Sequence, residues 1–343
     1  MDASYPVVIG TGGIGSGMLL SLIGNHTLGR EESRLAKLIP QEDRCKLHII
    51  THYTNEFLKN KAKIYLIGAV GSDEQGRLLY EELQNSGFIT DFVKKDPEHP
   101  STFSVCFKYE NNDGGNITLT DSASEYVQPE DIDKAENVFT ANKGHGIALA
   151  APEVPLKTRK RLLELASEND FYRFASFASG EIKEAIADGY LELIDCLAIN
   201  IDEAFAAADQ IYLGQDIDKD TLLNIISALR RKNDKIKVTI TEGKKGSWCW
   251  DGKELFFNKG ISVNAVNTAG AGDSYLGSLM TAKALNLSLK DACMLATLVS
   301  AQSVMAKDTI NRDVSPLSTL EFIRKLKLQA PESILLALQM LSK

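Results

Sequence analysis

The sequence predicts an α/β fold in which a mostly parallel sheet lies between layers of helices. Two observations support this prediction. Short apolar runs typical of strands recur along the 343-residue chain, and amphipathic stretches typical of helices separate several of them. Neither an internal repeat nor a linker rich in Pro, Gly or Ser divides the chain. Because strands alternating with helices form parallel sheets covered on both faces, we expect one domain over residues 1–343.

The individual elements follow from hydrophobic periodicity. The runs expected to be strands are Val7–Ile9, Leu47–Ile50, Ile64–Ile67, Ile147–Ala150, Cys196–Ile199 and Lys237–Ile240. The amphipathic stretches expected to be helices are Gly76–Asn85, Leu156–Ser167, Ile182–Leu193 and Asp220–Lys232.

One segment breaks the alternation of strands and helices. Thr102–Tyr109 and Ile117–Thr120 are β-rich runs on either side of Asn111–Gly115, a strong turn signal. Adjacent antiparallel strands inside an α/β chain predict a small accessory sheet. We therefore expect a lid hairpin at about residues 102–120.

The last third of the chain predicts a second hairpin and a helical tail. Trp248–Trp250 and Leu255–Phe257 are strand-like and are joined through Asp251 and Gly252. The tail from about Pro316 reads as helix.

Composition and charge exclude several functions. The net charge of −8 gives no support for a nucleic-acid surface or a basic membrane-binding face, so neither partner is expected. Five isolated cysteines argue against a disulfide scaffold and against a cysteine zinc site. The first residues lack the layout of a signal peptide, and no apolar run is long enough to span a membrane. We therefore expect a cytoplasmic protein.

The opening stretch, Val7–Met18, contains Gly10-x-Gly12-x-x-Gly15, the spelling of a dinucleotide-binding turn. Such a turn requires a second strand about 20 residues on that ends in an acidic residue. Glu31 and Glu32 stand near that distance, but the residues before them are not strand-like. The stretch is therefore interpreted as a loop near a site, where glycines allow close backbone approach because a Cβ would occupy substrate volume.

A more specific pattern lies at Asn267–Met280, "NTAGAGDSYLGSLM". Small residues at the start of an amphipathic helix leave the amides free to bind an anion, and the helix dipole reinforces this. Asp273 follows them, where an anion would be expected. A carboxylate beside a phosphate pocket suits a general base that deprotonates an attacking hydroxyl. The alternative is an aspartate that only caps the helix.

This stretch resembles a known signature. Gly270–Asp273, with Thr268 before it and Tyr275 and Gly277 after it, resembles the C-terminal motif of the ribokinase-like (pfkB-type) carbohydrate and nucleoside kinases. The resemblance extends from Val7 to about residue 315. It implies a ribokinase-like three-layer sandwich with a small β-sheet lid, and ATP and Mg²⁺ as cofactors.

The resemblance also implies roles for individual residues. Asp273 would be the catalytic base and would contact the acceptor, and the amides of Gly270, Ala271 and Gly272 would form the anion hole for the transferred phosphoryl group. Asn200 and Glu203 match the family's Asn-x-x-Glu motif, which serves magnesium and the phosphates.

Two further stretches agree in order. Thr241–Gly246 resembles the family's nucleotide-phosphate loop, with Thr241, Gly243 and Gly246 as binding residues. Leu66–Gly76 resembles the family's N-terminal "G-x-V-G-x-D-x-x-G" stretch, which is mostly scaffold. For each stretch the alternative is a helix start or a surface turn without a ligand.

The acceptor pocket departs from the family pattern. The loop Gly10–Gly17 lacks the aspartate that usually holds sugar hydroxyls, and only Asn55 remains of a glycine-glycine-asparagine stretch. The residues expected to line a rebuilt pocket are Gly12, Gly13, Arg30, Glu31 and Asn55. His52 is either a ligand or a hydrogen-bonded core histidine.

Departures also affect the ion and the nucleotide. Asn267 stands where many members carry an aspartate near a monovalent-cation site, so activation by such a cation is in doubt. Thr297 stands where family members commonly have an asparagine beside adenine. We therefore expect Thr297 to contact the nucleotide, and the nucleotide preference stays open.

The sequence thus favours an ATP-dependent kinase acting on a hydroxyl of a sugar, sugar acid, polyol or nucleoside. A substrate-binding or regulatory protein on the same scaffold and a nicotinamide-dependent oxidoreductase are the alternatives. Phe103, Val105 and Phe107 alternate along the lid hairpin and leave one apolar face, so a homodimer through the lid is also expected.

Overall fold

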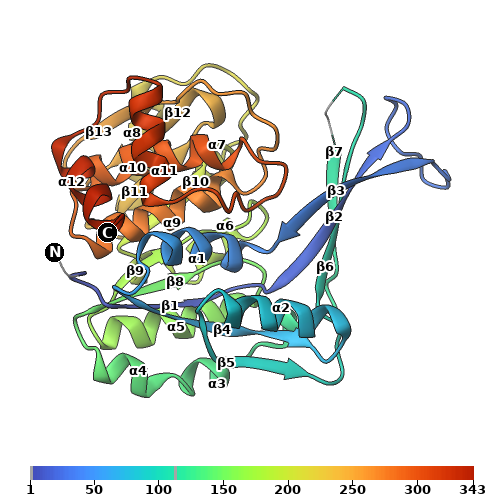
Figure 1. Ribbon diagram of the computed structural model, residues 1–343, viewed down its shortest axis with the longest axis horizontal. Helices are drawn as coiled ribbons and strands as arrows, with labels where there is room; N and C mark the ends of the chain where they lie inside the picture. Colours follow the sequence, from blue (N-terminus) through green and yellow to red (C-terminus); the bar gives the residue numbers. More distant parts are fainter. Residues whose placement is uncertain (1–2, 112–113) are drawn as a thin grey trace.

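The computed structural model describes residues 3–111 and 114–343 and contains two β-sheets with helices around the larger one (Figure 1). The spatial order of the nine described strands of sheet A is β13 (Leu255–Lys259), β12 (Gly246–Trp250), β11 (Lys237–Thr241), β10 (Cys196–Asn200), β9 (Tyr172–Ala175), β8 (Gly146–Ala150), β1 (Val7–Thr11), β4 (Lys63–Gly71) and β5 (Ile89–Asp96). Neighbouring strands pair in parallel, except that β12 runs antiparallel to both of its neighbours.

Helices cover both faces of sheet A. The helices that share the first core are α1 (Lys46–Phe57), α2 (Glu74–Asn85), α9 (Ala271–Ala284), α10 (Leu289–Ser303), α11 (Pro316–Lys325) and α12 (Glu332–Leu341). Those that share the second core are α3 (Pro129–Asp133), α4 (Glu136–Ala141), α5 (Leu156–Glu168), α6 (Ile182–Ala187), α7 (Ile201–Ala207) and α8 (Lys219–Arg230). Val8 faces the first core and its neighbours Val7 and Ile9 face the second, as the alternation of a strand requires. The result is the expected three-layer arrangement.

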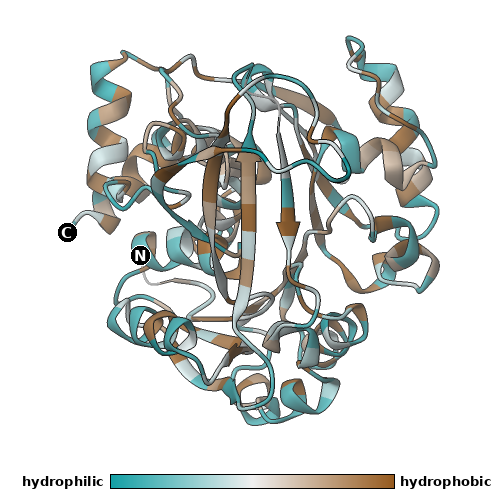
Figure 2. Cartoon of the chain, turned by 90° about the vertical axis from the view of Figure 1, so that its right-hand side faces the viewer, coloured by the Kyte–Doolittle hydropathy of each residue, from teal (hydrophilic) through white to brown (hydrophobic). Residues whose placement is uncertain are grey.

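Sheet B projects from this body (Figure 1). Its strand order is β3 (Ala36–Arg44), β2 (Gly15–Leu22), β6 (Thr102–Lys108) and β7 (Gly114–Thr118), with β2 and β6 parallel and the outer pairs antiparallel. Figure 2 views the molecule from this side and shows hydrophobic residues along these strands. The expected hairpin is thus present as β6 and β7, although the middle of its turn, Asn112 and Asp113, lies outside the described residues.

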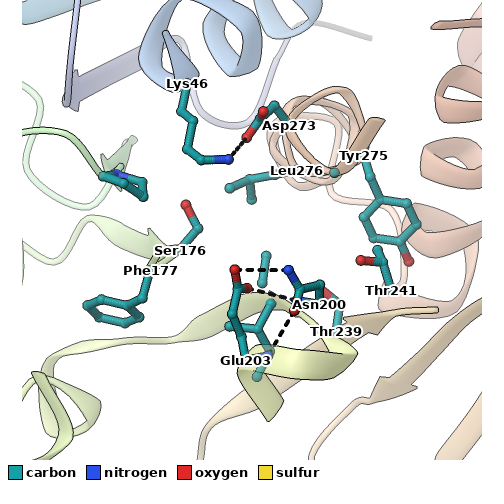
Figure 3. A pocket seen from close by; sticks show the side chains of 14 residues that line it. Lys46, Ser176, Phe177, Asn200, Glu203, Thr239, Thr241, Asp273, Tyr275 and Leu276 are labelled. Atoms are coloured by element: carbon teal, nitrogen blue, oxygen red, sulfur yellow. Dashed lines mark hydrogen bonds and ion pairs between the residues drawn. The ribbon is translucent and has the colours of Figure 1, made fainter. Parts of the chain in front are cut away.

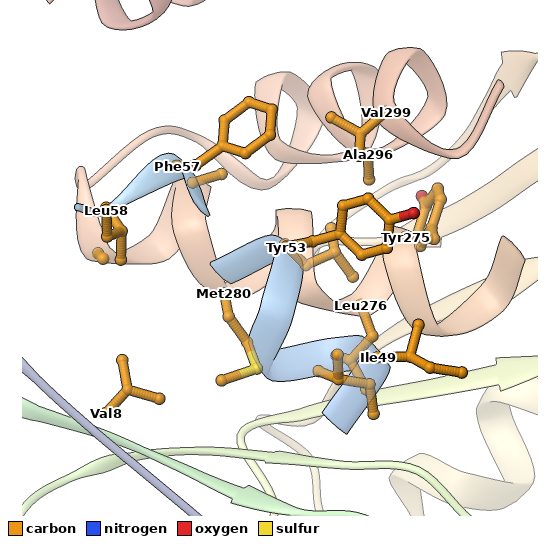
Figure 4. Close-up of a cluster of buried hydrophobic side chains, with 14 of the residues drawn as sticks. Val8, Ile49, Tyr53, Phe57, Leu58, Tyr275, Leu276, Met280, Ala296 and Val299 are labelled. Carbon is orange, nitrogen blue, oxygen red and sulfur yellow. The ribbon is translucent and has the colours of Figure 1, made fainter. Parts of the chain in front are cut away.

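The close packing of α1 on α9 positions the site described below. Ile49 and Tyr53 of α1 and Leu276 and Met280 of α9 belong to one buried cluster (Figure 4). A Cβ at Gly277 would lie 2.3 Å from the Ile50 carbonyl oxygen, so only glycine permits this approach. The Thr54 hydroxyl donates to the Gly277 carbonyl at 3.0 Å. These contacts bring the two helix N-termini to one place.

Several expected elements are confirmed and two are wrong. Apart from two stretches, the expected strands and helices are present, as are the second hairpin and the helical tail. Leu47–Ile50 was expected to be a strand but lies in α1, because its apolar side chains pack onto α9 instead of entering a sheet. The helix expected over 182–193 ends at Ala187, and the left-handed Gly189 separates it from the 3₁₀ turn η2 (Leu191–Leu193).

Two short 3₁₀ turns complete the described elements, η1 (Ala123–Tyr126) and η3 (Gly243–Lys245). Within residues 3–111 and 114–343, every helix is too short or too polar to cross a membrane.

Candidate active site

A cavity opens where α1, α9 and the carboxyl ends of strands β9, β10 and β11 meet (Figure 3). Ligands of open α/β sheets bind at the carboxyl ends of the strands. Asn200, Glu203, Thr241, Gly272 and Asp273, all expected at the site, line this cavity.

The N-terminus of α9 is built for close approach. Gly270 caps the helix with a φ of 79°, a left-handed conformation that favours glycine. A Cβ at Gly270 would also lie 2.7 Å from the Thr309 carbonyl oxygen. A Cβ at Gly272 would meet nothing within 4 Å, so the helix end is open toward the cavity. The Ala271 amide donates to the Thr268 carbonyl at 3.3 Å, so this expected anion-hole amide already has an acceptor.

Asp273 lies in the first turn of α9 and is only 9% exposed. Its Oδ1 lies 3.4 Å from Nζ of Lys46, the first residue of α1 (Figure 3). The negative charge of Asp273 is the main cause of the raised pKa of Lys46, and burial opposes it. Lys46 therefore stays protonated and faces the carboxylate that is the expected base.

Lys46 was missed because the expected strand Leu47–Ile50 placed it in a sheet instead of at a helix start. Its location directly before an apolar run with helical spacing at Leu47, Ile50 and Phe57 was the available signal.

Glu153 is a second carboxylate near Lys46. It follows β8 with a φ of 75°, and its Oε2 accepts the Lys46 amide at 3.0 Å. Burial raises the pKa of Glu153 to about 7, and the charge of Lys46 opposes this rise. The signal for Glu153 was its location just after the strand Ile147–Ala150, at the edge of the sheet where ligands bind.

Asn200 and Glu203 form a capping box at the end of β10. Asn200 Oδ1 accepts the Glu203 amide at 2.8 Å, and the Glu203 carboxylate accepts the amide and the Nδ2 of Asn200 at 2.9 and 3.0 Å. Burial is the main cause of the raised pKa of Glu203. Two carboxylate oxygens and an amide oxygen beside the cavity are donors that Mg²⁺ accepts when water and phosphate supply its other ligands.

The expected phosphate loop follows β11. Thr241 lines the cavity, and Gly243 begins η3 with a φ of 52° and open space around its Cβ position. Gly246 has a φ of 133°, and a Cβ there would overlap the Asn258 backbone. The geometry of the β12–β13 hairpin is therefore sufficient to explain why this residue is glycine. Thr297 is buried in α10, and its hydroxyl donates to the Cys293 carbonyl at 2.8 Å.

The expected acceptor residues lie elsewhere. Arg30 is exposed in the connection between β2 and β3. Asn55 donates to the Ser86 carbonyl at 2.7 Å, which joins α1 to the end of α2. Neither is among the residues that line the cavity.

Gly12 and Gly13 are buried by the chain itself. A Cβ at Gly12 would lie 2.8 Å from the Ala151 Cβ, and one at Gly13 would lie 2.5 Å from the Glu153 Cβ. The space that these glycines leave is therefore filled by the segment after β8, which corrects the expectation that it holds substrate. His52 is buried, and burial lowers its pKa to about 3, so it is a neutral core residue.

The opening glycines also lack the context of a dinucleotide turn, because β1 leads into strand β2 instead of a helix. Two cavity-lining hydroxyls were missed, those of Ser176 and Thr239. Their oxygens are buried and have no hydrogen-bond partner among the described residues. Ser176 was missed because β9 was not expected as a strand.

Asn267 joins two loops next to the α9 N-terminus. Its Nδ2 donates to the Lys307 carbonyl at 2.8 Å, and its Oδ1 accepts the Ala269 amide at 3.0 Å. The Asn267 amide thus donates directly to the Lys307 carbonyl. An aspartate at this position has no donor, so it would need a cation between its carboxylate and that carbonyl.

Comparisons with known proteins agree with this geometry. The model of the pfkB family carbohydrate kinases matches residues 58–315. A deoxyribokinase of Salmonella typhi is 26% identical over 254 residues, covering 73% of this chain and 78% of that protein. A ribokinase of Haemophilus influenzae is 24% identical over 263 residues, covering 76% and 82%.

Solved structures show the same fold. The ribokinase of Giardia lamblia has a TM-score of 0.77 at 15% identity and covers 94% of this chain and 100% of that one. The Arabidopsis thaliana ribokinase, solved with ribose and ATP, has a TM-score of 0.72 at 16% identity, with 94% and 99% covered. The chain belongs to the pfkB family of carbohydrate kinases, phosphotransferases with an alcohol group as acceptor.

Proposed function

We propose that this protein transfers the γ-phosphoryl group of ATP to a hydroxyl of a sugar or a sugar-like small molecule. One observation carries the proposal: a single cavity brings together Asp273 at a glycine-rich helix N-terminus, the Lys46 ammonium, and the Asn200–Glu203 pair. Phosphoryl transfer depends on such positioning and on stabilisation of charge.

In the proposed reaction the Asp273 carboxylate takes the proton of the acceptor hydroxyl. The hydroxyl oxygen forms a bond to the γ-phosphorus while the bond from that phosphorus to the bridging oxygen of ADP breaks. The N-terminus of α9 faces the negative charge on the transferred group with its amides and its positive dipole end. Lys46 lies 3.4 Å from Asp273 and adds a positive charge beside the same group.

Asn200 and Glu203 would hold Mg²⁺, and the ion would neutralise part of the negative charge of the nucleotide phosphates. The oxygen donors at the cavity edge fit this ion. Thr241 and Gly243 would contact the nucleotide phosphates, since Thr241 lines the cavity and no side chain fills the space beside Gly243. The named relatives, a deoxyribokinase and ribokinases, support a sugar or nucleoside acceptor.

The test is a phosphorylation screen. Purified protein with ATP and Mg²⁺ is offered pentoses, hexoses, polyols, sugar acids and nucleosides, and the phosphorylated product is detected by mass spectrometry. We expect a product with at least one acceptor. If none of these acceptors is phosphorylated and ATP is not consumed, the result would contradict a kinase and favour a binding protein on this scaffold.

Sheet B is proposed to cover the acceptor and to pair with a second copy. Phe103, Val105 and Phe107 point to one face of β6 and are only partly buried, and Ile117 of β7 is 62% exposed. Covering this face in a dimer would remove apolar surface from water. Sedimentation that shows only monomer at micromolar concentration would contradict the dimer. Closure of the lid is tested separately, by measuring whether the acceptor protects β6 and β7 from hydrogen exchange.

A further inference from the structure

Three glycines at alternate positions explain the unusual opening of the chain. Gly13 lies two residues before β2, and Gly15 and Gly17 lie at the start of this strand, where alternate residues share one face. A Cβ at these positions would lie 2.7 Å from Glu153 Oε2, 2.8 Å from Cys45 Sγ and 2.4 Å from Asp43 Oδ2, respectively. Each glycine thus makes room for a polar group from another segment.

These groups form a line that starts at the cavity. Glu153 contacts the Lys46 amide, and its carboxylate is hydrogen-bonded to the Cys45 thiol. The next group along β3 on this face is Asp43, which pairs with Gly17 across the strands. The line therefore runs from Lys46, which contacts Asp273, through Glu153 and Cys45 to Asp43 in sheet B.

Asp43 is the least compensated member of this line. It is only 9% exposed, and none of the ion pairs within residues 3–111 and 114–343 includes it. Its neighbours are the Arg44 amide at 3.0 Å and the weakly polar Cys106 thiol at 3.8 Å. Burial raises the pKa of Asp43, and the Arg44 amide and the Thr309 hydroxyl oppose the rise.

A second contact places Asp43 next to the phosphoryl site. The Thr309 hydroxyl that bonds to Asp43 belongs to the loop whose carbonyl oxygen abuts Gly270, the cap of α9. Thr309 thus links Asp43 to the N-terminus of α9, and Cys45 and Glu153 link it to Lys46. Asp43 and Glu153 themselves lie behind the described residues that line the cavity.

We infer, on the basis of the proposed function, that Asp43 determines acceptor specificity by accepting hydroxyls of an uncharged polyhydroxyl acceptor, replacing an acidic group that the β1–β2 segment lacks. The Gly17 position, which has no side chain, is what admits the Asp43 carboxylate to this face. A carboxylate accepts two or more hydroxyl hydrogen bonds and does so more strongly than an amide.

The charges around the cavity define the acceptor class. Lys46 is the one basic side chain among the described residues that line it, whereas Glu203 and Asp273 line it as acids. Asp43 adds a further acidic group behind the cavity, whereas Glu153, with a pKa of about 7, carries only part of a negative charge at neutral pH. A carboxylate on the acceptor would face these like charges without an arginine or a second lysine to compensate. Neutral sugars and polyols are therefore the substrates, and sugar acids are excluded.

The test compares Asp43→Asn, which keeps the shape, with the matched control Glu42→Gln. Glu42 is the preceding residue of β3, and its exposed side chain pairs with Arg312. Each protein is assayed with pairs of an aldose and its aldonic acid, and ATP is varied separately. Acceptor binding without turnover is measured by calorimetry with a non-hydrolysable ATP analogue, and thermal unfolding confirms that each variant is folded.

We expect Asp43→Asn to raise the acceptor KM and the acceptor dissociation constant at least about tenfold, because one charge-assisted hydrogen bond is lost. The ATP KM should stay within about twofold, the preference for the neutral aldose should shrink, and Glu42→Gln should match the wild type. An unchanged acceptor KM in a folded, active Asp43→Asn protein would overturn the inference while leaving the proposed function standing. A wild-type protein that phosphorylates none of the acceptors would overturn the proposed function instead.

Discussion

The two sides of the site that we propose for the phosphates and for the acceptor are built in different ways. On the proposed phosphate side, Asn200, Glu203 and Gly270–Asp273 form caps and a helix N-terminus within a few residues of sequence. On the proposed acceptor side, Asp43 and Lys46 belong to one segment, and Glu153 lies 107 residues after Lys46 in the sequence. Gly17 and Gly13 leave room for Asp43 and Glu153.

The family match shows the same division. It begins at residue 58 and so includes the phosphate side but not β1–β3 or α1. The comparison teaches that a local motif can be recognised from sequence alone, whereas a wall assembled from distant side chains can change its residues without leaving a readable pattern.

The largest effect on the acceptor side concerns the pH dependence of stability. Glu153 has a pKa of about 7 in the folded protein against an ordinary value of 4.5. Between these values the unfolded chain has already lost this proton while the folded protein keeps it, so the free energy of unfolding falls as pH rises. In the wild type, the free energy of unfolding should fall by about 3 kcal/mol between about pH 5 and about pH 8 because of Glu153, and Glu153→Gln should abolish this fall.

Urea denaturation of both proteins at the two pH values measures this difference. Equal pH dependence in the wild type and in Glu153→Gln would mean that Glu153 titrates normally and is not part of a buried wall.

The next effect concerns the charge that joins the two sides. Lys46→Met should lower the turnover per acceptor KM about ten- to hundredfold, because Asp273 and Glu153 would then face each other and the phosphates without a cation. The side chain is 40% exposed, so water replaces part of the lost interaction. Steady-state kinetics measures the loss, and Lys61→Met, at a partly exposed site outside the cavity, is the control.

These residues also mark what the sequence could predict. Most strands of the parallel sheet followed from apolar periodicity, although β5 and β9 were not expected, and the proposed phosphate side followed from short sequence motifs. Lys46 did not, because Leu47–Ile50 has the composition of a strand and becomes a helix only by packing on α9. Asp43 and Glu153 did not, because only the tertiary structure brings them opposite Gly17 and Gly13.

A smaller effect concerns the opening glycines. Gly12→Val should cost about 1–3 kcal/mol of stability, because its Cβ would lie 2.8 Å from Ala151 Cβ and 3.0 Å from Leu47 Cβ. Thermal unfolding measures this loss. Gly180→Ala is the control, since a Cβ there meets nothing within 4 Å. A fully stable Gly12→Val protein with a raised acceptor KM would restore the interpretation that this glycine leaves space for substrate.

The smallest effect concerns monovalent cations. The Asn267 amide already bridges to the Lys307 carbonyl, so turnover in potassium, sodium or choline salts should agree within about twofold. Asn267→Asp places a carboxylate against that carbonyl and should make turnover depend on a small cation. Strong potassium activation of the wild type would contradict this interpretation of Asn267.

The central claim is that Asp273 is the base of a phosphoryl transfer, and the turnover and ATP affinity of Asp273→Asn test it most directly. The variant keeps the shape of the side chain and the helix N-terminus, so ATP should bind within about threefold of the wild type while turnover falls by roughly two to four decades. Both quantities are measured with the preferred acceptor of the wild type. A variant that retains more than about a tenth of wild-type turnover would contradict the account, because a positioned general base contributes more than that.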